Sequence, residues 1–318
     1  MRSVQLLGLS VLSVLLGPAA VLTACSSSSP APQADHAALS PDGGSGGESR
    51  PASREAGAAA DATPAACTPA TGLPVAAMVT TPAGYKIDKT EVTRAQYAAW
   101  LATKPSLACQ PAACSWNTSF EPDAACIKGQ GEVPMSVCKT SCDNHPQVCV
   151  HWCDAHAYCQ GIGKHLCGRI GGGVLAYDEF ADPAKSEWVS ACSAGGKLAY
   201  SYGAAYVEGT CNDFRLDKQT TVEVGSLAGC TAVTAGYEGL VDLIGNVSEL
   251  MDACREATAA ELDAAKQNGV TDTPDMQARC HLGSGSFTGT PTYSTCTADN
   301  KANRSLVLGN MGFRCCSN

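Results

Sequence analysis

The apolar positions of the chain follow three different patterns along its length. A largely apolar run covers residues 4–22, where two glycines and a proline interrupt it. Residues 26–73 hold Ser, Pro, Ala and Gly with almost no large apolar side chain. From Met78 onward, short apolar segments alternate with glycine-rich stretches. The pattern predicts a leader, a linker and one folded domain over residues 74–318.

Several segments of this domain have the spacing of amphipathic helices. Thr93 with Gln96 three residues later has the pattern of a capping box. Tyr97, Trp100 and Leu101 then share one face at helical spacing. A short strand is expected just before, within "GYKIDK" (84–89). Further helices are expected at residues 151–163, near residues 185–193, and at residues 255–267.

The first residues indicate where in the cell the protein is located. Arg2 precedes the apolar run, and Leu-Thr-Ala-Cys ending at Cys25 follows it. This arrangement resembles the lipobox of bacterial lipoproteins, which implies that residues 1–24 are a signal peptide and that Cys25 is lipidated. The alternative is an uncleaved transmembrane helix. Acyl chains on Cys25 would anchor the protein in the membrane.

The segment after the lipobox completes this prediction. Ser26 resembles the outer-membrane sorting signal, so we expect an outer-membrane lipoprotein of the cell envelope that faces either the periplasm or the outside. Residues 25–73 cannot bury enough apolar surface to offset the entropy of ordering, which predicts a disordered tether. Cys67, near the end of this segment, is a candidate to staple it to the domain.

The chain has 19 cysteines, and 18 remain when Cys25 is set aside. An even number in an exported protein indicates a set of disulfide bonds. Cys315 and Cys316 are adjacent, so we expect them to pair with different partners. Six cysteines and four histidines within residues 138–167 leave zinc as an alternative, but their spacing does not match the common zinc motifs.

The formal net charge of −9 argues against nucleic acid as a partner, because binding its phosphates requires Lys and Arg. The excess of acidic side chains either keeps the protein soluble or contributes to calcium binding. "GLVDLIGNVSEL" (239–250) places Asp242 and Glu249 around a Gly245-Asn246 turn inside an apolar stretch. Calcium requires hard oxygens from carboxylates and carbonyls in such a loop. The alternative is a buried turn in which both acids cap backbone N–H groups.

Seven segments in this order resemble the formylglycine-generating enzyme family, also called the sulfatase-modifying factor domain. They are "IDKTEVTRAQYAAWL" (87–101), "HPQVCVHWCDAHAYCQGIGKHLCGRI" (145–170), "SEWVSACSAGG" (186–196), "YSYG" (200–203), "GLVDLIGNVSEL" (239–250), "GSGSF" (283–287) and "GFRC" (312–315). The resemblance implies a disulfide-rich α+β fold of the C-type-lectin-like kind, with little regular secondary structure.

The resemblance also implies calcium sites. Its first site would use Asp242, the carbonyls of Gly245 and Val247, and Glu249. A second site falls near Asn212 and Asp213, with Asp217 as a weaker candidate. The loop around this second site is shorter than is usual in the family.

Enzymes of this family oxidise a substrate cysteine to formylglycine and hold Cu(I) between two thiolates, which are the ligands that select this soft ion. Their two cysteine positions correspond here to Gly289 and Ser294. Cys296 follows two residues later, so an insertion would restore one ligand but not two. Ser286 of the Gly-Ser-aromatic motif is present, and Ser286 and Cys296 are the positional candidates for a catalytic role. Copper is therefore not expected.

We favour a non-catalytic domain that binds a protein, peptide or glycan at the cell envelope. The alternative is a formylglycine-generating oxidase with ligands rearranged around Cys296. A third hypothesis is a structural envelope protein stabilised by its disulfide bonds.

Overall fold

The computed structural model describes residues 67–130 and 135–318. These residues belong to the second of two compact units, which spans residues 60–318. The predicted signal peptide, the lipidation site at Cys25 and the tether up to residue 66 lie outside the described residues. No helix within the described ranges has the length and apolar character needed to cross a bilayer.

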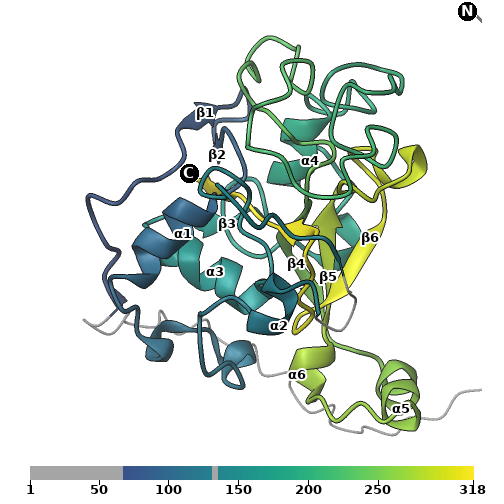
Figure 1. Ribbon diagram of the computed structural model, residues 1–318. Helices are drawn as coiled ribbons and strands as arrows, with labels where there is room; N and C mark the ends of the chain where they lie inside the picture. Colours follow the sequence, from purple (N-terminus) through teal and green to yellow (C-terminus); the bar gives the residue numbers. More distant parts are fainter. Residues whose placement is uncertain (1–66, 131–134) are drawn as a thin grey trace, which may run out of the picture. The chain divides into compact units, whose positions relative to one another are not determined.

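Two small sheets form the framework of the domain (Figure 1). The first has the strand order β1–β2–β8–β3, and all of its pairings are antiparallel. The second has the order β6–β5–β4–β7, in which only the β4–β7 pairing is parallel. The strands are β1 (Met78–Thr80), β2 (Lys86–Asp88), β3 (His165–Leu166), β4 (Ser248–Arg255), β5 (Arg279–Gly283), β6 (Asn300–Asn303), β7 (Met311–Gly312) and β8 (Cys315–Ser317).

The predicted helices are present. Helix α1 (Arg94–Leu101) begins with the expected capping box: Gln96 N donates to Thr93 Oγ1 over 3.3 Å, and Thr93 N donates to Gln96 Oε1 over 2.9 Å. These two bonds satisfy backbone donors that a helix start leaves unpaired. The other helices and 3₁₀ turns are α2 (Ala124–Ile127), α3 (Trp152–Gly161), α4 (Glu187–Cys192), α5 (Ala259–Gln267), α6 (Pro274–Gln277), η2 (Leu107–Cys109), η3 (Ala112–Cys114), η4 (Tyr177–Glu179) and η5 (Pro291–Tyr293).

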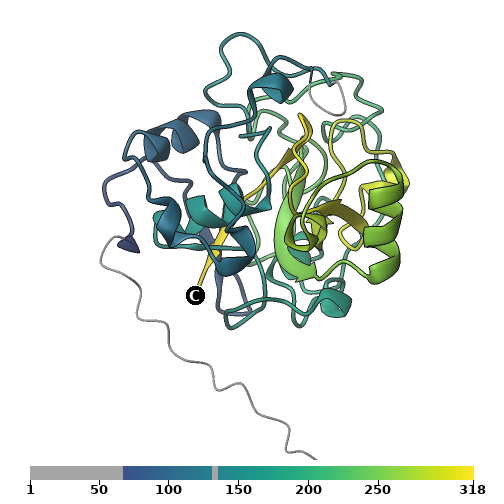
Figure 2. The ribbon, with the colours of Figure 1, turned by 90° about the horizontal axis from the view of Figure 1, so that it is seen from below.

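The core has two main clusters: α1 and α3 contribute to one of them, and α4 contributes to the other. Helices α1 and α3 pack through an aromatic group in which Tyr97 stacks on Tyr158, with ring centroids 5.5 Å apart, and Trp100 meets Tyr158 edge-on. Helix α4 inserts Trp188 into the other cluster. Helix α5 buries none of its residues, and it lies with α6 beyond the end of the β4–β5 pair (Figures 1 and 2). Short strands and long loops leave much of the backbone outside regular structure.

Nine disulfide bonds join all eighteen cysteines of the described residues. The neighbours Cys315 and Cys316 pair with Cys159 and Cys167, so the prediction of different partners is confirmed. Cys67 pairs with Cys109 and so ties residue 67 to the domain. The remaining bonds are Cys114–Cys153, Cys126–Cys149, Cys138–Cys142, Cys192–Cys296, Cys211–Cys230 and Cys254–Cys280.

The disulfides also bear on the zinc alternative. All six cysteines that it would use, within residues 138–167, are bridged and are therefore not thiolate ligands.

Candidate functional site

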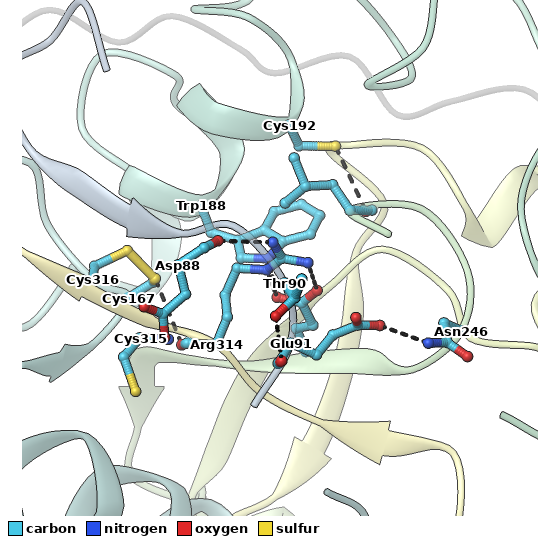
Figure 3. A network of polar contacts seen from close by, with 12 residues as sticks. Asp88, Thr90, Glu91, Cys167, Trp188, Cys192, Asn246, Arg314, Cys315 and Cys316 are labelled. Atoms are coloured by element: carbon cyan, nitrogen blue, oxygen red, sulfur yellow. Dashed lines mark hydrogen bonds and ion pairs between the residues drawn. A yellow bond between two sulfur atoms is a disulfide. The ribbon is translucent and has the colours of Figure 1, made fainter. Parts of the chain in front are cut away.

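A buried guanidinium lies at the centre of the polar network that joins the two sheets (Figure 3). Arg314, between β7 and β8, is completely buried. Its Nη1 donates to the carbonyls of Asp88 and Lys89 over 3.1 and 3.3 Å, and its Nη2 donates to that of Val241 over 3.0 Å. Nε and Nη2 also donate to the two oxygens of Glu249 over 2.6 and 2.7 Å. All five N–H groups of Arg314 therefore have an acceptor.

Glu249, on β4, is held by more than this bidentate pair. The indole nitrogen of Trp188 donates to Glu249 Oε2 over 2.8 Å. Each carboxylate oxygen of Glu249 thus accepts from a buried donor. Buried ion pairs persist when their remaining hydrogen-bonding capacity is satisfied in this way, and this one connects α4, β4 and the segment before β8.

Asp242 and the Gly245-Asn246 turn form the other half of the motif. Asp242 Oδ2 accepts from the backbone N–H of Gly225 over 2.5 Å, while its Oδ1 has no partner among the described residues. Asp242, Gly245 and Asn246 all have positive φ. A Cβ at Gly245 would lie 2.4 Å from the carbonyl oxygen of Asn212, so only glycine fits this turn.

Glu91 joins the network although it was not among the predicted site residues. It lies between β2 and α1, is fully buried, and its Oε1 accepts from Asn246 Nδ2 over 3.0 Å. Its Oε2 has no partner among the described residues. Burial raises the pKa of Glu91 well above its usual range, and the nearby charge of Asp242 raises it further. The "EVT" segment was part of the family resemblance, but nothing in a single sequence places Glu91 beside Asp242.

The predicted four-ligand calcium set fits this geometry only in part. Asp242 offers an unpartnered carboxylate oxygen of the kind that Ca²⁺ prefers. Both carboxylate oxygens of Glu249 accept hydrogen bonds from Arg314 and Trp188. Glu249 would therefore have to give up its ion pair with Arg314 in order to bind Ca²⁺. The carbonyls of Gly245 and Val247 belong to the same turn. Calcium binding by this set stays a prediction.

The side chains predicted for a second calcium site have different hydrogen-bond partners in the structure. Asn212 is buried and bonds through Nδ2 to Asn246 Oδ1 over 3.2 Å, which places it beside the first set. Asp213 Oδ1 instead accepts from the backbone N–H groups of Arg215 and Leu216. Asp217 is exposed, and its Oδ1 accepts from Gln219. The structure thus joins Asn212 to the Asn246 turn and gives Asp213 the role of a local cap.

The positions expected for copper ligands carry no thiol. A Cβ at Gly289 would lie 3.0 Å from the Gly285 Cα and from the Ser286 backbone, so a side chain there would have to displace main-chain atoms. Ser294 is fully buried, and its hydroxyl donates to the Thr290 carbonyl over 3.1 Å. Cys296 is bonded to Cys192 of α4.

Ser286 has the contacts of a turn residue. Its Oγ lies 3.0 Å from Thr288 Oγ1 and accepts from Asn310 Nδ2 over 2.9 Å and from the backbone N–H of Thr288 over 3.3 Å. Ser286 is 2% exposed. These bonds tie the 285–289 turn to the segment before β7.

Aromatic side chains border the same loop. Phe214 and Tyr293 are 56% and 59% exposed, and the Phe214 N–H donates to the Gly289 carbonyl over 3.2 Å. The Tyr200 hydroxyl donates to the Pro291 carbonyl over 3.4 Å, and the Tyr200 ring stacks on Tyr202 with centroids 5.4 Å apart. Burial raises the pKa of Tyr202 to about 12. We call Tyr200, Tyr202, Phe214 and Tyr293 the aromatic border of the 285–294 loop.

One further group of side chains has the spacing of metal ligands. Single ligand atoms of Cys167, Glu187 and Cys316 lie within 4.8 Å of one another, and all three residues are buried. The two cysteines are bonded to each other, and Glu187 accepts from His165 Nε2 over 3.0 Å. The sulfur atoms of this group are therefore not thiolates.

The comparison with protein-family models agrees with the resemblance in the sequence. A family model described as "Sulfatase-modifying factor enzyme 1-like domain" matches residues 51–318. No curated protein sequence matches the chain significantly. Similar solved structures include CarF (16% identity, TM-score 0.41, 73% of this chain and 86% of that one). Two others are Treponema denticola variable protein 1 (18%, 0.43, 77% and 92%) and PvdO from Pseudomonas aeruginosa (17%, 0.46, 74% and 80%).

The expected fold class is confirmed: the domain is an α+β, disulfide-rich fold of the C-type-lectin-like formylglycine-generating-enzyme kind, with little regular secondary structure. Since the family model covers 51–318, well over half of its residues, the chain belongs to the sulfatase-modifying factor, or formylglycine-generating enzyme, domain family.

Proposed function

We propose that this protein is a pseudoenzyme of the family: a non-catalytic module that binds a protein, peptide or glycan at the cell envelope. The disulfide between Cys192 and Cys296 carries the proposal. Cys296 is the nearest cysteine to the expected copper positions, and a bridged sulfur cannot act as a thiolate ligand for Cu(I). With Gly289 and Ser294 at those positions, the loop lacks the donor pair that the oxidase chemistry requires.

The aromatic border supports a binding role. Phe214 and Tyr293 expose apolar surface beside the loop that carries the chemistry in the family's enzymes. Aromatic rings exposed in this way are typical of surfaces that bind peptides or the apolar faces of sugars. Membrane attachment through Cys25, with the tether as a spacer, would hold this surface at the envelope.

Thiol counting and peptide turnover together test the proposal. We expect denatured, non-reduced mature protein to show no alkylation of residues 67–318, and no oxygen consumption with Cu(I) and a Cys-x-Pro-x-Arg peptide. A peptide with Ser in place of Cys serves as the control. Two free thiols, or formylglycine in the recovered peptide, would establish the oxidase alternative instead.

A further inference from the structure

One of the nine disulfide bonds differs from the others in its surroundings. Cys138 and Cys142 are both half-buried, and both lie outside helices and strands, in the loop between α2 and α3. Every other bond among the described residues has a buried cysteine or, in Cys67–Cys109, a cysteine within η2. Accessible bonds outside the packed framework exchange with external thiols more readily than buried structural bonds do.

The ring closed by this bond is short and holds a strained residue. Its sequence is Cys-Lys-Thr-Ser-Cys, and Ser141 has a φ of 56°. A residue with a Cβ adopts this left-handed conformation at a cost in free energy. The Cys138 carbonyl accepts from Arg94 Nη1 over 3.3 Å, and the Cys142 carbonyl accepts from the His145 N–H over 3.0 Å. Opening the S–S bond therefore removes a constraint on Ser141 while both ends of the ring stay anchored.

Arg94 brings an uncompensated positive charge to this ring. Its Nε and Nη2 are buried and have no partner among the described residues, whereas Arg314 uses the same edge to hold Glu249. Burial lowers the pKa of His145, and the charge of Arg94 lowers it further, so the guanidinium lies close to this histidine as well as to Cys138. A cation beside a cysteine favours the thiolate, which is the form that attacks and leaves in thiol–disulfide exchange.

A surface cavity gives an external thiol access to the bond. Its volume is about 460 Å³, which lies in the range of small-ligand sites, and its lining includes Cys138, Lys139 and His145. No Asp or Glu of the described residues lines it, and Asp143, which follows the ring, is exposed to solvent. The lining therefore presents cationic and polar groups to an incoming thiolate.

We propose that Cys138–Cys142 is a redox-active disulfide that exchanges with small thiols, while the other eight bonds are structural. In the first step a thiolate RS⁻ attacks Cys138 Sγ, the S–S bond breaks, and Cys142 leaves as a thiolate. A second RS⁻ attacks the sulfur that carries R, which forms RSSR and releases the Cys138 thiolate. The two thiols RSH thus supply the two electrons and the two protons of the reduced pair. This exchange is separate from the proposed binding function and from the 285–294 loop.

Glutathione buffers of graded composition test this on the full chain with its native disulfides. Free thiols are trapped with N-ethylmaleimide, and the alkylated cysteines are located by peptide mass spectrometry. Cys138 and Cys142 are half-reduced at a [GSH]²/[GSSG] ratio at least about tenfold lower than any other pair. The internal control is Cys67–Cys109, the other pair with two half-buried cysteines. Reduction of both pairs at the same ratio would overturn the proposal.

Arg94→Gln removes the cation and leaves both cysteines in place. A thiol whose pKa is about one unit higher leaves about threefold more slowly, so the rate of reduction falls by about this factor. Arg94→Lys keeps the charge and retains most of the wild-type rate. Arg215→Gln, at an exposed residue outside this loop, is the matched control and exchanges like the wild type.

A wild-type rate in Arg94→Gln, or an equal loss in Arg94→Lys, would overturn the proposal, because the pair would then be no more than an accessible bond. Neither measurement involves the Cys192–Cys296 bond or ligand binding. A failure here is therefore distinct from a failure of the proposed function.

Discussion

Arg314 links the two sheets through the hydrogen bonds of its guanidinium. Its guanidinium contacts the end of β2, the segment before the 242–249 turn, and β4, which are far apart in the sequence. The sequence identified the acids of the 239–250 motif, because carboxylates around a glycine turn have a recognisable chemistry. Neither Arg314 nor Glu91 could be assigned in the same way, since their partners lie 65 and 155 residues away.

Replacing Arg314 leaves a charged Glu249 without its partner. We expect Arg314→Met to lower the free energy of unfolding by about 3–5 kcal/mol, because the remaining carboxylate is buried and uncompensated. Chemical denaturation measures this. Arg169→Met is the matched control: the Arg169 guanidinium is half exposed and lies 3.5 Å from Glu179, so a loss of about 0–1 kcal/mol is expected. Equal losses in both variants would contradict the role given to Arg314.

Asp154 gives the domain a pH dependence of its own. Burial raises its pKa from 3.8 to about 8, while its oxygens accept from the His151 N–H and from Asn117. The folded state therefore keeps a proton that the unfolded state has lost above about pH 4. The stability from this group is complete below the unfolded pKa and is lost as the pH rises towards 8.

Between pH 6.5 and 8, wild-type protein should lose about 1 kcal/mol per pH unit relative to Asp154→Asn, which cannot titrate. Urea unfolding at several pH values measures the difference. The comparison with Asp154→Asn cancels the contribution of other groups that titrate in both proteins, including His165, whose pKa the contact with Glu187 raises above its usual value despite burial. Parallel curves for the two proteins would show that Asp154 does not titrate in this range.

At the scale of elements, local signals predicted the helices and the short strand β2 (Lys86–Asp88), which lies within the expected segment 84–89, but they did not predict the other strands or the pairing of the sheets. Helices α1, α3, α4 and α5 lie where spacing and capping residues placed them, because those signals act within four residues. Most strands of two to five residues carry too little alternation to be predicted, and the partner of β2 could not be predicted because β2 pairs with β8 across more than 220 residues. Within residues 67–130 and 135–318, β4 is the one long strand, with eight residues, and the glycine turn before it obscured where it begins.

The capping boxes of α1 and α5 allow a comparison between a packed and an unpacked helix. Thr93→Ala should lower the free energy of unfolding by about 1 kcal/mol, because α1 buries Tyr97 and Trp100 in the core. Thr258→Ala removes the same kind of cap from α5, which has no buried residues. The free energy of global unfolding should therefore fall by less than about 0.5 kcal/mol. Similar losses would mean that α5 unfolds together with the core.

At the scale of the whole molecule, covalent bonds take the place of extensive secondary structure. The even cysteine count predicted a disulfide set, but the pairing depends on the fold and could not be read from the sequence. The bonds close loops of very different size, from a separation of 4 residues in Cys138–Cys142 to 156 in Cys159–Cys315. Each bond stabilises mainly by restricting the unfolded chain, and more so for longer loops.

This dependence on loop length predicts unequal losses from paired substitutions. Replacing both Cys192 and Cys296 by Ser, which opens a loop with a separation of 104 residues, should cost about 5 kcal/mol. The same change at Cys138 and Cys142 should cost about 2 kcal/mol. Guanidinium unfolding of the two double variants provides the comparison, and an inverse order would indicate that native strain outweighs chain entropy.

Cys315 and Cys316 come after every other cysteine of the domain, yet they hold α3 and the segment after β3. As the chain is synthesised from its N-terminus, Cys159 and Cys167 precede their partners by about 150 residues. During that interval their thiols remain open to mispairing with the cysteines that emerge between them. We therefore expect maturation in the cell to require a disulfide isomerase. Because Cys315 and Cys316 are synthesised last, formation of their two bonds would limit the rate at which the native protein accumulates.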